Sequence, residues 1–546
     1  MKKFSKICAV GMTIATLLSV AACGPKGGGD VISNDENTLN VKIRKAGYGT
    51  SYIYELKEQF EKTFAEEGYK INVLAPREDL GASSVYREIY SGGGIDVYFT
   101  TDANAGVAVN GEYGKTTADI TEGVFKKSAI KFDGSEETQT IEEKLSYYNM
   151  DGGLIGDKVY GIPYALSIGG LAVNKKVLQE NGLEVPRTSK EMLDAADKIM
   201  ETANSTDRFP FAFSLTGQNY VHSTLNAWIA QYGGIEEYNK IMSFDNADGT
   251  IMDNPEAVYE YDSLKYALEI IYNFYDYNMA AYGCSTSDFS TVQGKIMRGD
   301  ATFMSVGDWM FNEEFERFTN YLNDVVFVNT PVISQLGIKL FGAGSSYNMS
   351  EDDADKTLST IIKYADQNKL AEEIKPLVDQ ELGKNINLED VKTVCERRGI
   401  TRIRSACDLV VSEKSEKKDL ANIFLRFCAS EEAGQLFAKE ARTISPYSYK
   451  VAVNSEYAWI KSASNVAMNP YLKLIDIAAQ GTRKQLGVAL FPNAGEFFST
   501  GIYEQGVTRY DDSLKLVKGR DVYTTAVAAM LNAEYEYARD RISWSK

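Results

Sequence analysis

From Leu39 onward the chain alternates between hydrophobic and polar residues, a pattern that predicts a strand with one buried face. The hydrophobic members of this strand are Leu39, Val41 and Ile43. Four large apolar residues then follow at intervals of four, which is the spacing of one helix face: Tyr52, Leu56, Phe60 and Phe64. We expect Gly68 to end this helix in a left-handed cap, because glycine adopts that conformation without steric strain.

The next stretches, KINVLA, SSVYREIYSGG and IDVYFTTD, predict a strand, a short helix and a third strand. This β-α-β-α-β order implies a parallel sheet covered by helices. Ligands of open α/β sheets bind beyond the carboxyl ends of the strands. Two glycine-rich stretches do not fit a phosphate loop: AGYGTS lacks a third glycine and a following lysine, and SGGGID precedes its strand. We interpret AGYGTS as a loop that faces a ligand.

The stretch YGIPYALSIGGLAVN predicts an extended chain that passes through two glycines, and we interpret it as a crossing between two lobes. Downstream, Pro186 ends one helix, and Thr188 with Glu191 forms a capping box that begins the next. The buried stripe of this second helix is Leu193, Ala196 and Met200. A later segment, from about Leu336 to Arg402, carries Glu and Lys at helical spacing and predicts a helical insertion.

The first residues have the layout of an export signal. Three lysines precede an apolar run from Ile7 to Val20, which is too short to span a bilayer comfortably. The run ends in VAAC, which resembles the bacterial lipobox, whose cysteine thiol carries a diacylglycerol. We expect residues 1–22 to be a signal peptide, Cys23 to be lipidated and residues 23–38 to be a flexible tether. The alternative is an ordinary secretory signal with an incidental cysteine.

The composition limits the function. With 546 residues the chain is too long for one core, so two lobes are expected. A formal net charge of −18 argues against binding nucleic acids or anionic lipid headgroups, which need basic patches. The only histidine, His222, nearly excludes catalytic triads and most zinc sites, which need imidazole. Glycoside hydrolysis by a carboxylate pair stays open, because Asp and Glu are abundant.

Four cysteines remain once the signal peptide is removed and Cys23 is lipidated: Cys284, Cys395, Cys407 and Cys428. An exported protein could form one or two disulfides among them, although the spacing does not give the pairing. They form no C-x-x-C pair and have no nearby histidine. We expect no metal site and no cofactor.

Several motifs occur together in the order found in one family. The stretch YGIPYALSIGGLAVNKKVLQENGLEVPRTSKE resembles the family 1 extracellular solute-binding proteins of ABC importers, with a Y-G-I-P-Y-like strand, an N-K element and a P-x-T-x-x-E helix start. LNAWIAQYGG is similar to the family's aromatic helix that ends in paired glycines. QGKIMRGDATFMSVGDWM resembles its G-K-x-A-M-x-x-G-x-W element loosely, and we interpret it as a helix, a strand and a loop that carries an aromatic residue.

The resemblance implies an α/β, periplasmic-binding-protein-like fold of type II, with two lobes and a ligand cleft between them. Lobe 1 is expected at residues 39–160 and 403–453. Lobe 2 is expected at residues 161–402, including the helical insertion at about 336–402, and residues 454–546 are expected to be C-terminal helices, mainly in lobe 2. A ligand favours the closed arrangement of such lobes only through contacts with both of them.

Carbohydrate is the ligand class that we favour. Sugars stack their C–H face on aromatic rings, and their hydroxyls pair with planar polar groups. The candidate ligand-binding residues are Tyr48, Asp102, Asn219, His222, Trp228, Trp309, Glu496 and Phe497. Trp309 and Asp102 follow expected strand ends, whereas Trp228 lies within an apolar helix, where a core position is the commoner one. For His222 the two interpretations are balanced.

We therefore expect a lipid-anchored protein on the extracellular face of the cell membrane that captures a sugar or oligosaccharide. It would deliver this ligand to the permease subunits of an ABC transporter. We expect a monomer with no catalytic residues and no nucleic-acid partner. Three alternatives stay open: a secreted glycoside hydrolase with a carboxylate pair, an adhesive lipoprotein, and a binding protein for a non-sugar polar solute.

Overall fold

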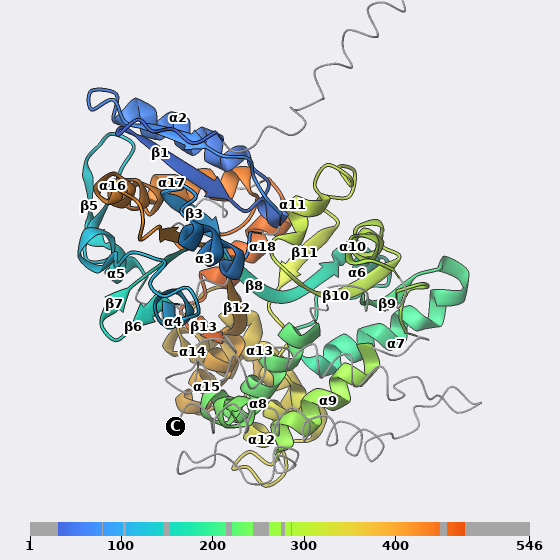
Figure 1. The fold of residues 1–546 in the computed structure, drawn as a ribbon. Helices are drawn as coiled ribbons and strands as arrows, with labels where there is room; N and C mark the ends of the chain where they lie inside the picture. Colours follow the sequence, from blue (N-terminus) through green and yellow to red (C-terminus); the bar gives the residue numbers. More distant parts are fainter. Residues whose placement is uncertain are drawn as a thin grey trace, which may run out of the picture.

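The predicted β-α-β-α-β run is confirmed in the computed structural model of the chain (Figure 1). The structure describes residues 31–78, 80–101, 105–145, 153–214, 221–243, 261–274, 279–284, 287–447 and 456–475. The first elements are β1 (Thr38–Ile43), the 3-10 helix η1 (Ala46–Tyr48), α2 (Ser51–Thr63), β2 (Lys70–Val73), α3 (Ala82–Ser91) and β3 (Val97–Thr100). β1 pairs in parallel with both β2 and β3. Gly68 has the expected left-handed φ of 73° and donates its N–H to the carbonyl of Phe64 over 3.1 Å.

Two long antiparallel strands extend this sheet, β8 (Ile162–Asn174) and β12 (Ile400–Val411). The last residues of β12 also pair with β3. The last residues of β8 pair with β10 (Ala301–Gly307) and β11 (Val325–Val328). β9 (Phe209–Ala212) lies parallel to β10 at the far edge of the sheet. The stretch interpreted as a crossing is thus a single strand, β8, of 13 residues.

The buried side chains divide into separate cores along β8 and β12. One large cluster is drawn from residues 39–165 and 407–447, and we call it the lobe 1 core. Two others are drawn mainly from residues 168–400 and 459–475, and we call them together the lobe 2 core. The chain passes from one core to the other within β8 and within β12. The fold therefore has two lobes, while their boundaries in the sequence stay a prediction.

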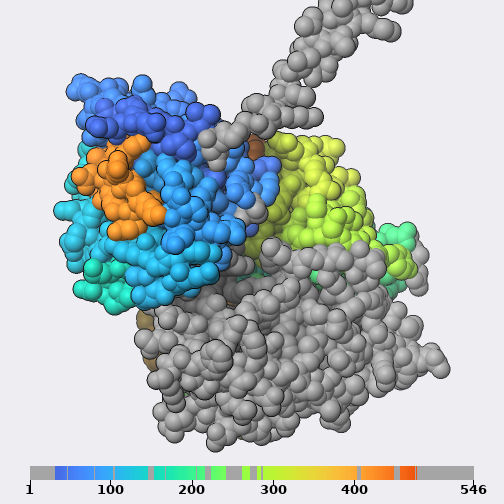
Figure 2. Space-filling view, in the orientation of Figure 1, coloured from blue at the N-terminus to red at the C-terminus, as the bar shows by residue number. Residues whose placement is uncertain are grey.

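Two helices complete lobe 1 from a distant part of the sequence. These are α16 (Lys418–Cys428) and α17 (Glu431–Glu440). Figure 2 shows this orange segment lying against the blue N-terminal part and apart from the yellow-green residues near 300. The apolar stripe of α16 contributes Leu420, Phe424 and Phe427 to the lobe 1 core.

The described part of the tether is bound to lobe 1 rather than free. The side-chain amide of Asn40 on β1 accepts from the N–H of Ser33 over 2.8 Å and donates to its carbonyl over 2.9 Å. Asn72 on β2 donates to the carbonyl of Val31, also over 2.8 Å. The side chains of Asn40 and Asn72 therefore hold the backbone of Val31 and Ser33 against the sheet, and the flexible tether over residues 23–38 stays a prediction. Residues 23–30 lie outside the described residues.

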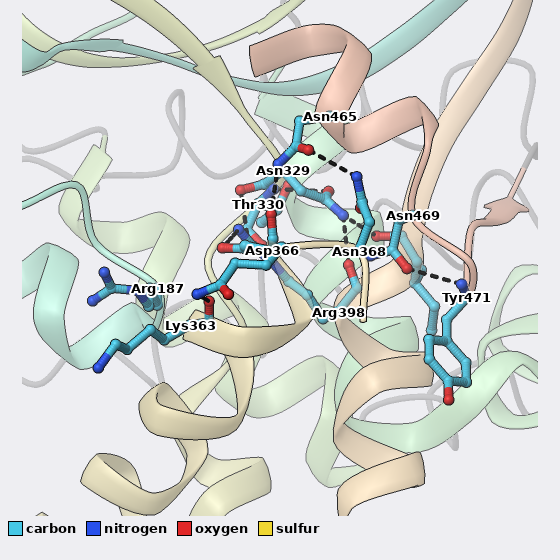
Figure 3. Close-up of polar contacts among 12 residues, drawn as sticks. Arg187, Asn329, Thr330, Lys363, Asp366, Asn368, Arg398, Asn465, Asn469 and Tyr471 are labelled. Carbon is cyan, nitrogen blue, oxygen red and sulfur yellow. Dashed lines mark hydrogen bonds and ion pairs between the residues drawn. The ribbon is translucent and has the colours of Figure 1, made fainter. Parts of the chain in front are cut away.

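The segment predicted as helical contains α12 (Ser334–Phe341), α13 (Glu351–Ala365), α14 (Ala371–Leu382) and α15 (Leu388–Gly399). Figure 3 shows the polar contacts that fix these helices. Arg398 is 4% exposed, and its Nε and Nη2 donate to the two carboxylate oxygens of Asp366 over 2.7 and 2.9 Å. Its Nη1 donates to the carbonyl of Thr330, after β11, over 3.0 Å. The helices are thus joined to the sheet of lobe 2.

The same contacts reach the end of the described chain. Asn465, on α18 (Ala458–Ala467), donates to the carbonyl of Asp366 over 2.6 Å (Figure 3). The hydroxyl of Tyr471 accepts from the N–H of Ala371 over 2.8 Å. After it, β13 (Lys473–Ile475) pairs in parallel with β12. The segment around α18 is therefore part of lobe 2 in this structure.

The remaining elements of the described chain are α4 (Ala105–Asn110), η2 (Thr121–Phe125), β4 (Ser128–Ile130), β5 (Glu136–Thr140), α5 (Ile141–Lys144), β6 (Leu154–Ile155), β7 (Lys158–Val159), α6 (Lys175–Glu180), α7 (Ser189–Thr206), α8 (Val221–Ser243), α9 (Asp262–Phe274), α10 (Phe289–Arg298) and α11 (Met310–Glu314). Thr188 is the N-cap of α7 as expected, since its hydroxyl accepts from the N–H of Glu191 over 3.2 Å. The second half of the predicted capping box differs, because the Glu191 carboxylate accepts from the N–H of Arg187 over 2.7 Å. Within the described ranges, no helix combines the length and apolar character that crossing a membrane requires.

The four cysteines considered for disulfides are all buried free thiols: Cys284, Cys395, Cys407 and Cys428. No disulfide therefore joins any of these four cysteines in this structure, although an exported protein could form them. Burial raises the pKa of the Cys407 and Cys428 thiols, which keeps both protonated. These residues fill the core as small hydrophobic side chains.

Candidate functional site

The register of the sheet brings strand ends from both lobes toward each other. In lobe 1, Thr100 at the carboxyl end of β3 pairs with Asp408 of β12, which in turn pairs with Pro163 of β8. In lobe 2, Gly307 at the carboxyl end of β10 pairs with Gly169 of β8. These two points on β8 are about 20 Å apart at the strand rise of roughly 3.3 Å per residue. The carboxyl ends thus flank the junction, where an open α/β sheet binds ligands.

Trp309 lies at this junction and touches both lobes. It lies two residues after the end of β10, and its half-buried indole folds back over Gly307, where an added Cβ would collide with Cζ3 and Cη2 of the ring. A Cβ on Gly47 of η1 would lie 3.1 Å from Trp309 Cδ1. The indole therefore lies between a glycine of each lobe. Although it belongs to lobe 2 by sequence, Trp309 packs against the lobe 1 core.

Glu313 lies one helical turn after Trp309 and places a carboxylate beside the same loop. A Cβ on Gly47 would lie 2.8 Å from Oε1 of Glu313. Its Oε2 accepts from Nε2 of Gln293, on α10, over 2.8 Å, and Gln293 is 1% exposed. Much of the Glu313 side chain is exposed, yet the protein around the carboxyl desolvates it and raises its pKa; Glu78 of lobe 1 adds to this shift. Glu313 is thus an accessible hydrogen-bond acceptor whose position is held by Gln293.

Asp308 fixes the turn that carries Trp309. Its side chain is 1% exposed, and Oδ1 accepts from the N–H of Ile168 on β8 over 2.9 Å. Oδ2 accepts from the hydroxyl of Thr443, and the Asp308 carbonyl accepts from Nε1 of Trp459 over 2.9 Å. Burial raises the pKa of this carboxyl to about 6, and the hydrogen bond from Thr443 opposes the shift. Asp308 therefore joins three chain segments and is closed to a ligand.

Two sequence-predicted site residues occupy core positions. The Tyr48 ring lies 5.6 Å from the ring of Phe437 inside the lobe 1 core, and burial raises the pKa of its hydroxyl. Trp228 is fully buried, and its indole N–H donates to the carbonyl of Pro331 over 2.8 Å. Both side chains are buried. A buried position does not favour contact with a ligand, and the role of both residues in ligand binding stays a prediction.

The other candidates cannot be placed. Asp102, Asn219, Glu496, Phe497 and the lipidation residue Cys23 lie outside the described residues. β3 ends at Thr100, two residues before Asp102, as the strand-end argument expects. His222 is the second residue of α8, and the structure describes its backbone but not its side chain. These assignments stay predictions.

The sequence interpretation missed Asn312 and Glu313. It treated the residues after β10 as a loop, whereas Met310–Glu314 form the helix α11 with Trp309 as its N-cap. A helix places the residues three and four positions after Trp309 on the same side as the indole. Helical spacing after the tryptophan was therefore the signal that could have found them.

A cavity of about 270 Å³ lies at the opposite end of lobe 1, beside the bound tether. Its lining includes Asp96, whose carboxylate accepts from the N–H of Asn40 over 2.8 Å and from the hydroxyl of Ser415 over 2.6 Å. Lys417 lies 3.5 Å from the same carboxylate. Because these charged groups are paired with one another, we regard the cavity as part of the tether attachment and not as the ligand site.

Two lobes, a sheet with crossing strands and an aromatic residue at the junction define a two-lobe binding protein. The family model described as bacterial extracellular solute-binding protein matches residues 55–467. This match spans most of the sequence, and the chain therefore belongs to the bacterial extracellular solute-binding proteins. No curated protein matches the chain significantly.

Solved structures show the same fold at low sequence identity. A chitin oligosaccharide binding protein has a TM-score of 0.53 at 14% identity, covering 92% of this chain and 99% of its own. RafE from Streptococcus pneumoniae, in its apo form, has a TM-score of 0.55 at 13% identity, covering 93% and 100%. The ABC substrate-binding protein Lmo0181 from Listeria monocytogenes, in complex with cycloalternan, has a TM-score of 0.52 at 14% identity, covering 91% and 99%.

Proposed function

We propose that the chain binds a sugar or oligosaccharide at the junction of its two lobes and delivers it to the permease of an ABC transporter. It acts from the extracellular face of the cell membrane, where a lipid on Cys23 anchors it. It releases the ligand chemically unchanged. This proposal keeps the ligand class expected from the sequence and places it at a specific contact between the lobes.

The observation that carries the proposal is the position of the Trp309 indole between Gly307 and Gly47. An indole face suits the C–H face of a sugar ring. The carboxylate of Glu313 accepts hydrogen bonds, which sugar hydroxyls donate. It would repel an anionic ligand at the same place. An aromatic ring beside a carboxylate thus favours a neutral ligand with many hydroxyls.

The related structures support this ligand class. One is named a chitin oligosaccharide binding protein, and another is in complex with cycloalternan. Gly47 comes from lobe 1, whereas Trp309 and Glu313 come from lobe 2, so a ligand bound beside them contacts both lobes. Such a ligand shifts the equilibrium toward the closed arrangement. A permease that recognises that arrangement then binds loaded protein in preference to empty protein.

Calorimetric titration with a panel of oligosaccharides tests the proposal, with amino acids and short peptides as control solutes. The protein would begin at residue 24, so that no lipid is attached. We expect at least one oligosaccharide to bind at about micromolar Kd or tighter. Chromatography of the titrated mixtures should show the sugar intact. Steady release of shorter sugars would contradict the proposal in favour of a glycoside hydrolase, and binding of a control solute alone would contradict the ligand class.

A further inference from the structure

A second contact between the lobes lies beside Trp309. The side chain of Asn312 donates from Nδ2 to the carbonyl oxygen of Gly47 over 2.6 Å. Its Oδ1 accepts from Nη1 of Arg442 over 2.8 Å. We call Gly47, Asn312 and Arg442 the interlobe clamp. Hydrogen bonds that share one amide polarise each other, so the two contacts reinforce one another.

The clamp joins segments that belong to different lobes. Asn312 lies on α11, and its neighbour Phe311 is part of the lobe 2 core. Gly47 lies in η1, directly after β1 of lobe 1. Arg442 follows α17, and its neighbour Ala441 is part of the lobe 1 core. Two groups of lobe 1 therefore hold one amide of lobe 2.

Arg442 reaches lobe 2 from the end of α17. It follows Ala441, the C-cap of that helix, and its φ of 51° is the left-handed conformation in which many helices end. The guanidinium lies 3.7 Å from the centroid of the Phe315 ring, directly after α11, and the hydrogen bond to Asn312 adds to this contact. Both of these contacts of the Arg442 guanidinium are thus made across the junction.

The clamp and the indole cannot move independently. The N–H of Asn312 donates to the carbonyl of Trp309 over 3.1 Å within the same helical turn. If the lobes separate at this edge, the hydrogen bond from Asn312 to Gly47 breaks and Trp309 leaves Gly47 at the same time. The clamp therefore controls the arrangement in which the indole lies between the two lobes.

We propose that Asn312 and Arg442 are positioning residues that hold the lobes together beside Trp309 and thereby slow the release of the ligand. The effect on ligand release rests on the function proposed above, whereas the effect on the lobes concerns the protein without ligand. A ligand binds more weakly when less of the protein has the competent arrangement. Loss of the clamp then lowers affinity without changing which sugars bind.

Stopped-flow dissociation of the best oligosaccharide of the panel measures the first effect. We expect Arg442→Ala and Asn312→Ala each to raise the dissociation rate by roughly tenfold, the loss typical of one hydrogen bond to a charged group. The double variant should add little beyond either single one, because both remove the same coupled contact. Arg442→Lys should restore part of the slow release, since it keeps a cationic donor.

Arg317→Ala is the matched control. Arg317 also contacts an aromatic ring, that of Phe318 at 5.3 Å, and it pairs with Glu314 at 2.9 Å, but both partners belong to lobe 2. We expect its variant to release sugar at the wild-type rate. A control that accelerates release as much as Arg442→Ala would contradict a role across the junction.

Distances between spin labels measure the second effect without any ligand. Tyr54 on lobe 1 and Tyr282 on lobe 2 are 49% and 69% exposed, so Tyr54→Cys and Tyr282→Cys provide accessible label sites. We expect Arg442→Ala to broaden or lengthen the distance distribution and Arg317→Ala to leave it unchanged. An unchanged distribution in Arg442→Ala would overturn the clamp. A changed distribution with no sugar bound by any variant would keep the clamp and overturn the proposed function.

Discussion

At the scale of single residues, glycine positions decide where the Trp309 indole lies. Gly307 leaves room for the ring on one side, and Gly47 of the other lobe approaches it on the other. Trp309 could be selected from the sequence because it follows an expected strand end. Its neighbours Asn312 and Glu313 could not be selected from the sequence. Their contacts depend on the short helix α11 and on a segment more than two hundred residues earlier.

Gly307→Ala tests the position of the indole. The added Cβ would collide with the Trp309 ring, so the ring must move away from the junction. We expect sugar affinity to fall at least about tenfold and the free energy of unfolding to fall by about 1–3 kcal/mol. Gly81→Ala is the control, because nothing lies within 4 Å of its added Cβ. Wild-type affinity of Gly307→Ala would show that the ring position does not matter.

The stability of the junction should depend on the ionisation of Asp308. Burial raises its pKa from 3.8 to about 6, so the folded chain holds a proton that the unfolded chain has already lost. The stability from this group is fully present below about pH 4 and is lost as the pH rises through 6, about 3 kcal/mol in all. We expect Asp308→Asn, which stays neutral, to lack this decrease in urea unfolding from pH 4 to 7.

Asp133→Asn provides the control for that pH series. Asp133 is exposed, and hydrogen bonds from Ser135 lower its pKa, so its stabilising effect is lost as the pH falls. Its variant should be slightly less stable than wild type at neutral pH and should approach wild type as the pH falls, whereas Asp308→Asn should be more stable than wild type at neutral pH. Parallel curves for Asp308→Asn and wild type would contradict a raised pKa at the junction.

At the scale of elements, hydrophobic periodicity predicted β1, α2 and the helical segment after Leu336, and the extended stretch with two glycines predicted the crossing that is β8. The capping of α7 by Thr188 was also predictable from local residue types. The attachment of the tether was not, because the side chain of Asn40 replaces a strand partner and leaves no periodic signal. The four buried thiols likewise depend on packing that the cysteine spacing does not record.

Arg398→Ala tests how the helices α13–α15 are joined to lobe 2. It removes the partner of Asp366, which is 34% exposed, and the donor to the carbonyl of Thr330. We expect a loss of about 3 kcal/mol in the free energy of unfolding, at the lower end for breaking a buried ion pair. Arg187→Ala is the control, since its partner Glu184 is 82% exposed, and it should change stability by about 0.5 kcal/mol or less. Equal losses would contradict the anchoring role.

At the scale of the whole molecule, the order of motifs predicted the family and the two-lobe fold. The order of the motifs gives the order of the strands and helices, so it predicts the topology of the sheet and its crossing strands. The contact of Trp309 with Gly47 could not be derived in this way, because it depends on how the two lobes lie relative to each other. The structure supplies that relation through the register of β8 with β10 and β12.

Cys23→Ser tests anchoring of the whole protein. Without the thiol no lipid can be attached, so we expect the protein in the culture medium or retained with its signal peptide. Fractionation and the mass of the protein measure both outcomes. Arg398→Ala, exported in parallel, controls for effects of lowered stability on export. A correctly cleaved Cys23→Ser protein that stays in the membrane fraction would contradict the lipid assignment.

Calorimetric titration of Trp309→Ala with the best sugar of the panel tests the central claim most directly. Loss of an aromatic contact of this kind weakens binding by about 2–4 kcal/mol, or about thirty-fold to several hundred-fold. Tyr54→Ala, which removes an aromatic ring that is 49% exposed on α2, should bind as wild type does. We expect weak or undetectable binding by Trp309→Ala, with a melting temperature close to that of wild type. Unchanged affinity together with a lowered melting temperature would contradict the account and make Trp309 a packing residue between the lobes.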